Sequence, residues 1–122
     1  MSYQDLVPLI STEIVGDFGY KEFANKGGFK NFMVGTLGYI GVIYYLIRSL
    51  QGSNILFVNG YWDGLSGLFE SIFAYVILGE RFEDPIQYAG VVFIIIGLFF
   101  MKAPLKRKNK FMFPKMFFKL KL

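Results

Sequence analysis

Two acidic residues, Glu13 and Asp17, lie inside an otherwise apolar stretch near the start of the chain. They are four residues apart, so they share one face of a helix. An ionised side chain at membrane depth costs about 2.5–3.5 kcal/mol on insertion scales, and acids placed there usually face a cavity and bind protons, ions or cationic ligands. Two carboxylates in a dry site cannot both ionise cheaply, so we expect one of them to hold a proton. Asp17 could alternatively lie in water at the helix end or pair with Lys21, again four residues on.

A second polar group follows in the third apolar stretch, where Asp63 and Glu70 are seven residues apart and face the same way. Tyr61 and Trp62 offer aromatic faces that can hold a cation, worth about 1–2 kcal/mol when desolvated. Trp and Tyr also serve as anchors at membrane interfaces, and the two acids could instead form a polar hydrogen bond between helices. The acids together point to chemistry with protons and cations.

Four apolar windows must position these residues, at about 4–20, 31–50, 54–79 and 85–103. A helix needs about 20 mostly apolar residues to cross a bilayer, and hydrophobic residues make up 54% of this chain of 122 residues. The first window is the weakest, as expected of a helix lined by functional polar groups. We therefore expect an all-α membrane protein, with four transmembrane helices in an up-down bundle over residues 1–103. A unit this small should form a dimer.

Small residues indicate where the helices meet or bend. Gly90 and Gly97 lie seven residues apart in the last window, a pattern typical of a helix–helix packing face, and we expect them at a dimer interface. Gly64 and Gly67 would let the third helix flex between two states. Between the first two windows we expect a loop over residues 21–30.

Residues 104–122 form a basic, aromatic tail. Interleaved lysines and aromatic side chains suit a segment at the surface of an anionic membrane leaflet, and a disordered tail that only determines the topology is the alternative. Beside a transmembrane helix we expect membrane lipids as partners and no nucleic acid. Nine of the 13 Lys and Arg residues fall on the side with both termini, against four on the other side. The positive-inside rule thus predicts a multi-pass integral membrane protein with both termini in the cytoplasm.

The composition also excludes several classes of chemistry. The chain has neither cysteine nor histidine, so disulfides and thiolate metal sites are ruled out, and proton transfer must use carboxylates. No nucleophile–base pair and no metal-ligand set stands out. We expect no enzyme activity, no cofactor and no metal.

From about Leu6 to Lys102 the chain resembles the small multidrug resistance transporters of the drug/metabolite transporter superfamily. Each motif is weak singly, but together they keep their order and spacing. The motifs are Glu13-Ile14-Val15-Gly16 with Lys21 after it, Tyr39, Tyr61-Trp62 with the glycines behind them, Gly79-Glu80-Arg81, and Gly90 through Gly97.

The resemblance implies a four-helix subunit that works as a dimer, typically antiparallel, and exchanges protons for cationic substrates by alternating access. Glu13 would bind proton and substrate in turn. Trp62 would stack on the substrate, opposite Tyr39 from the second helix. The dimerisation motif falls on Gly90 to Gly97.

The departures from the family pattern change the expected substrate. Asn59 replaces a tyrosine, Asp63 replaces a small hydroxylated residue, and Asp17 and Glu70 are additional acids. Three or four carboxylates suit a substrate with several positive charges, because each ammonium needs its own partner in a dry site. We expect a quaternary ammonium, guanidinium or polyamine cation, and favour the polyamine.

The basic tail disfavours inserting half of the copies upside down. It leaves open a homodimer of fixed orientation, a heterodimer with a related subunit of opposite charge bias, or a parallel arrangement of the two subunits. Two other functions also remain open. One is an oligomeric cation channel lined by the acidic helices, because rings of carboxylates select cations. The other is a non-transporting accessory membrane subunit whose acids satisfy a partner.

Overall fold

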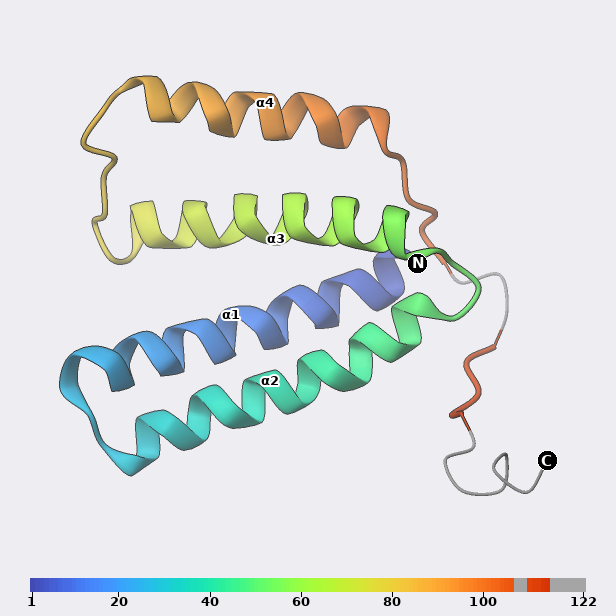
Figure 1. The fold of residues 1–122 in the computed structure, drawn as a ribbon, viewed down its shortest axis with the longest axis horizontal. Coiled ribbons are helices and arrows are strands. Elements are labelled where there is room, and N and C mark those ends of the chain that lie inside the picture. The colour runs from blue at the N-terminus through green and yellow to red at the C-terminus, as the bar shows by residue number, and fades with distance from the viewer. Residues whose placement is uncertain (107–109, 115–122) are drawn as a thin grey trace.

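The structure is a computed structural model that describes residues 1–106 and 110–114. It consists of four helices, each antiparallel to the one before it, and the described residues contain no strand (Figure 1). The helices are α1 (Tyr3–Lys26), α2 (Phe29–Leu50), α3 (Ile55–Val76) and α4 (Ile86–Phe100). The predicted all-α fold with four helices is confirmed. Most of the predicted tail, residues 107–109 and 115–122, lies outside the described residues.

The first connection is much shorter than the predicted loop over residues 21–30. Helix α1 continues to Lys26, where an ion pair of 3.2 Å with Glu22 joins side chains one turn apart. Only Gly27 and Gly28 form the turn, with φ angles of 73° and 97°. Positive φ values are accessible to glycine at little cost. The loop prediction was wrong because the charged residues before the glycines extend the helix as an exposed last turn.

Helices α1 and α2 pack closely through glycines on both partners. A Cβ atom at Gly19 would lie 2.5 Å from the backbone nitrogen of Gly35, and one at Gly38 would press on the backbone of Gly16. Small residues at such positions let two helix backbones approach one another. This pair of helices forms the first hairpin of the fold.

Helices α3 and α4 form a second, looser hairpin. Among the helices, α4 packs only against α3, where a Cβ atom at Gly64 would lie 3.1 Å from Leu98. No residue of α4 is buried, and Phe99 on its surface is 76% exposed. A Cβ atom added at Gly90 or at Gly97 would have nothing within 4 Å among the described residues, so both glycines lie on an open face.

The buried core lies at the end of the bundle where the N-terminus meets α3 (Figure 1). It contains Leu6, Ile10 and Tyr61, which are at most 6% exposed. The Tyr3 and Tyr61 hydroxyls are hydrogen-bonded to one another. The backbone N–H of Tyr3 also donates to the carbonyl of Pro104 at 2.9 Å, which ties the chain beyond α4 to this end.

In the part of the chain that the structure describes, one helix is long and apolar enough to cross a membrane. This is α2, with a mean hydropathy of 1.3 over 18 residues. Helix α4 is also apolar, but it has 15 residues and falls short of the required length. One such helix also occurs in soluble proteins, so the predicted four-span arrangement stays a prediction.

Candidate functional site

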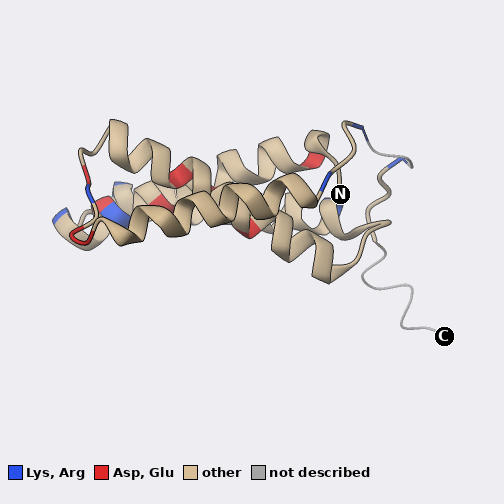
Figure 2. Ribbon diagram, turned by 90° about the horizontal axis from the view of Figure 1, so that it is seen from above, with Lys and Arg blue, Asp and Glu red and all other residues tan. Residues whose placement is uncertain are grey.

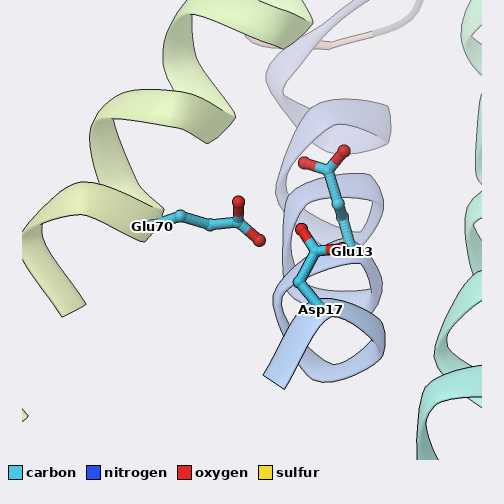
Figure 3. Close-up of side chains that lie close together, drawn as sticks. All are labelled: Glu13, Asp17 and Glu70. Atoms are coloured by element: carbon cyan, nitrogen blue, oxygen red, sulfur yellow. The ribbon is translucent and has the colours of Figure 1, made fainter. Parts of the chain in front are cut away.

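Three carboxylates meet between the two hairpins. Glu13 and Asp17 come from α1 and Glu70 comes from α3, and one oxygen of each lies within 4.8 Å of the other two. Figure 3 shows the Glu70 side chain reaching from α3 toward the two acids of α1. All three residues are half-buried. We call Glu13, Asp17 and Glu70 the acidic cluster.

No basic side chain neutralises the acidic cluster within the described residues. The ion pairs in the described part of the chain join Lys21 to Glu80, Lys26 to Glu22 and Arg48 to Asp5, and none of them includes a residue of the acidic cluster. The alternative in which Asp17 pairs with Lys21 is therefore not what the structure shows. Three like charges this close repel one another strongly, so the cluster must hold protons or take up a cation.

Tyr39 of α2 approaches the acidic cluster and donates a hydrogen bond from its hydroxyl to Oδ1 of Asp17. Its ring stacks on Tyr20 with a centroid distance of 5.6 Å and an interplanar angle of 16°. The Tyr20 hydroxyl is 3.0 Å from Oγ1 of Thr36. Asp17 is thus oriented by a tyrosine that is itself held in place.

Glu13 and Glu70 are less satisfied than Asp17. Each has a buried Oε1 atom with no hydrogen-bond partner among the described residues. Ser66, which is only 4% exposed, lies within hydrogen-bonding reach of Glu13. The sequence analysis missed Ser66, although its position four residues before Glu70 puts both on one face of α3. The two glutamates are the positions where an additional proton or cation would be stabilised most.

The structure separates the predicted aromatic residues. Tyr39 lies at the acidic cluster, but Tyr61 is buried in the core, where it contacts Tyr3. Trp62 is half-buried and packs against the same core. Its buried Nε1 atom has no hydrogen-bond partner in the described part of the chain. Tyr39 thus contacts the acidic cluster and Trp62 contacts the core, and the expected pairing of the two as aromatic walls stays a prediction.

Asp63 lies outside the acidic cluster, with an exposed side chain. It precedes Glu70 by seven residues, which is about 10 Å along a helix axis. The two acids share a face, as predicted, but only Glu70 is level with Asp17.

Of the glycines expected to allow flexing, Gly64 faces Leu98 of α4, whereas Gly67 would have nothing within 4 Å of an added Cβ atom.

The geometry of the acidic cluster suits several cations. Oxygen atoms within 4.8 Å of one another could surround an ammonium group, which has three donors. They could also bind a hard metal ion such as Ca²⁺ or Mg²⁺, both of which prefer oxygen ligands. The chemistry available is therefore the uptake of protons and of positively charged groups.

An ion pair that the sequence analysis missed lies at the start of α1. Asp5 is fully buried, with Oδ1 3.5 Å from Nε of Arg48 and Oδ2 3.3 Å from the Ser2 hydroxyl. The guanidinium of Arg48 also lies 5.2 Å from the ring centroid of Phe111. Asp5 is in the first turn of α1 and Arg48 in the last turn of α2. An antiparallel arrangement of these helices could have suggested the pair.

No protein-family model, no curated protein and no solved structure matches this chain. The resemblance to small multidrug resistance transporters stays a prediction.

Proposed function

We propose that the protein is a multi-pass membrane carrier that exchanges protons for small organic cations and works as a dimer. The observation that supports this best is the meeting of Glu13, Asp17 and Glu70 between the two hairpins, with no basic partner among the described residues. Such a cluster is stable only when protons or a cation compensate part of its charge.

The exposed surface supports a membrane environment. Large apolar side chains point outward on α2 and α4, among them Leu37, Ile43, Phe93 and Phe99, each at least 60% exposed. Soluble monomers rarely expose apolar patches larger than a few hundred Å². Figure 2 shows Lys and Arg mainly toward the two ends of the helices. Lipid tails or a second copy would cover such a surface.

Competition between proton and cation explains how exchange would be coupled. An empty cluster keeps protons because its carboxylates repel one another, and an incoming cation removes that repulsion and displaces them. If the cluster opens to one side of the membrane at a time, each cation moved requires protons to move the other way. Charges deep in a membrane are stable only when paired. The carrier would therefore rarely switch between its two open states with the acidic cluster both empty and deprotonated.

The number of acids favours a cation with more than one positive charge. The three carboxylates of the acidic cluster carry up to three negative charges in one place, and a cation with several positive charges compensates them more completely than a monovalent one. A polyamine fits this arrangement better than a monovalent cation. Guanidinium and quaternary ammonium ions remain the substrates to compare it with.

Transport currents on a solid-supported membrane test this function. Proteoliposomes would hold the wild type, Glu13→Gln, or the control Glu83→Gln, which makes the same chemical change in an exposed loop residue. Guanidinium, a quaternary ammonium ion and spermidine would be applied with and without a pH gradient. We expect saturable currents for the wild type and for Glu83→Gln, and none for Glu13→Gln. A steady ohmic current would indicate a channel, and silence of all three proteins would indicate an accessory subunit.

A further inference from the structure

A cleft of about 480 Å³ lies between α3 and α4, at the end of the molecule away from the termini. Ligand sites in proteins span about 300–1,000 Å³. The lining is mostly apolar and aromatic and includes Ile72, Tyr75, Phe82, Tyr88 and Val91. Ile72 and Tyr75 are nearly half exposed, so the cleft is open to the surroundings.

Arg81 is positioned at this cleft by the end of α3. Its Nη1 donates to the carbonyls of Tyr75 at 2.9 Å and Glu80 at 2.8 Å. Its Cζ atom lies 3.5 Å from the centroid of the Tyr75 ring. Neither Nε nor Nη2 has a hydrogen-bond or ion-pair partner among the described residues. Arginine has five donors in a planar fork that matches phosphate oxygens.

The charge around Arg81 is not cancelled by its neighbours in the cleft. Glu80 is the one acid that lines it, and its carboxylate pairs with Lys21 of α1. Glu83 and Asp84 belong to the same loop but do not line the cleft, and Asp84 accepts a hydrogen bond from the backbone of Ile86. Among the described residues no acid forms an ion pair with Arg81, so an anionic group at the cleft would find its guanidinium without a competing partner.

The length of α4 suggests the depth at which the cleft lies. Its 15 residues correspond to about 22 Å at 1.5 Å per residue, which is less than the hydrocarbon thickness of about 30 Å. The loop before α4 would then lie near the boundary between acyl chains and headgroups. The centroid of the Tyr88 ring lies 4.8 Å from that of Phe82 and 6.4 Å from that of Tyr75. Aromatic groups of this kind are typical of that boundary.

We propose that this cleft binds an anionic phospholipid, with an acyl chain between α3 and α4 and the phosphate on Arg81. The inference depends on the membrane placement of the proposed function, but it concerns a different surface from the acidic cluster. The apolar lining would contact the acyl chain, and the Arg81 guanidinium would bind the phosphate of the headgroup. Because α4 is short, a lipid of one leaflet can contact both the apolar lining and Arg81.

Native mass spectrometry of the full-length protein tests this site, with phosphatidylglycerol and with diacylglycerol of identical acyl chains, which lacks the phosphate. A charge-assisted hydrogen bond contributes about 1.5–3 kcal/mol, so we expect a preference for phosphatidylglycerol of roughly tenfold or more. Arg81→Gln should abolish the preference. Lys30→Gln, which removes an exposed positive charge at the same end of the molecule, should keep it. Ala74→Phe, which fills the cleft, should weaken the binding of both lipids.

Three outcomes would overturn the proposal. The wild type could bind both lipids equally, Arg81→Gln could keep the preference, or glycerol phosphate without acyl chains could compete as well as the lipid. Arg81 also donates a hydrogen bond to the Tyr75 carbonyl at the end of α3. If Arg81→Gln acted only through the loss of that hydrogen bond, it would lower the melting temperature by the same amount in the presence of either lipid. Glu13→Gln should retain lipid selectivity. A wild type that shows lipid selectivity but no transport would contradict the carrier only, and a wild type that transports cations but shows no lipid selectivity would contradict the lipid site only.

Discussion

At the scale of residues, the two unsatisfied glutamates matter most. Asp17 already accepts a hydrogen bond from Tyr39, whereas Glu13 and Glu70 each keep a buried oxygen without a partner in the described part of the chain. A buried acceptor without a partner costs about 1–3 kcal/mol, and more when it is charged. Protonation or a bound cation removes that cost. We therefore assign the exchange to these glutamates and a positioning role to Tyr39.

Glu70→Gln should distinguish a polycation site from a monovalent one. The substitution removes one of three negative charges, so spermidine should lose a charge-assisted contact worth about 1.5–3 kcal/mol and bind at least roughly tenfold more weakly. Guanidinium can still use the acids of α1 and should lose less. Fluorescence of Trp62, the single tryptophan, reports the binding. An equal loss for both cations, or an equal loss in Glu83→Gln, would count against a polycation substrate.

At the scale of elements, the two hairpins differ in how tightly they pack. Helices α1 and α2 meet through Gly16, Gly19, Gly35 and Gly38, where an added Cβ atom would collide with backbone or ring atoms. Helix α4 has no buried residue and rests on α3 alone among the helices. The first hairpin is therefore the rigid part that positions Glu13 and Asp17, and the second has more freedom to move Glu70.

Gly38→Ala should destabilise the fold because the new methyl group meets the backbone of Gly16. Overpacking typically costs about 1–3 kcal/mol. Gly67→Ala is the matched control, since a Cβ atom there would have nothing within 4 Å, and alanine is a better helix former than glycine by about 1 kcal/mol. Reversible unfolding in mixed detergent micelles measures both. Equal stability of the two variants would contradict the close packing of α1 on α2.

The sequence was informative about the elements and only partly about the site. Long apolar runs predict four helices, and the spacing of Glu13 and Asp17 predicts a shared face. Periodicity could not tell which of Asp63 and Glu70 would reach those acids, because the choice depends on how far α3 slides along α1. The close packing of α1 on α2 depends in the same way on which glycines face each other. The pairing of Asp5 with Arg48 also requires knowing that the two helix ends meet.

At the scale of the whole molecule, the open face of α4 is the surface left for a second subunit. Gly97→Leu should shift the protein toward monomers, because a large side chain would block a close helix contact there. It should leave the subunit itself intact, since a Cβ atom at Gly97 meets nothing within 4 Å in the described part of this chain. Light scattering of detergent-solubilised protein measures the mass, with Gly67→Leu as the control. An unchanged dimer would place the interface elsewhere.

The uneven distribution of basic residues predicts one orientation in the membrane. The predicted topology assigns nine of the 13 Lys and Arg residues to the side of the termini, so Lys110→Cys should face the cytoplasm and Glu83→Cys the outside. The chain has no cysteine of its own, so each variant carries a single label site. A membrane-impermeant maleimide applied to intact cells should modify only Glu83→Cys. Equal labelling of both variants would show dual topology.

If the protein exchanges protons for cations, the two must compete for the acidic cluster. The most direct test is to add spermidine to the solubilised protein in weakly buffered solution and measure the protons released. We predict release that saturates together with the Trp62 fluorescence change, undiminished in Glu83→Gln and strongly reduced in Glu13→Gln. Cation binding without proton release, or release that Glu13→Gln leaves unchanged, would contradict proton–cation exchange at this site.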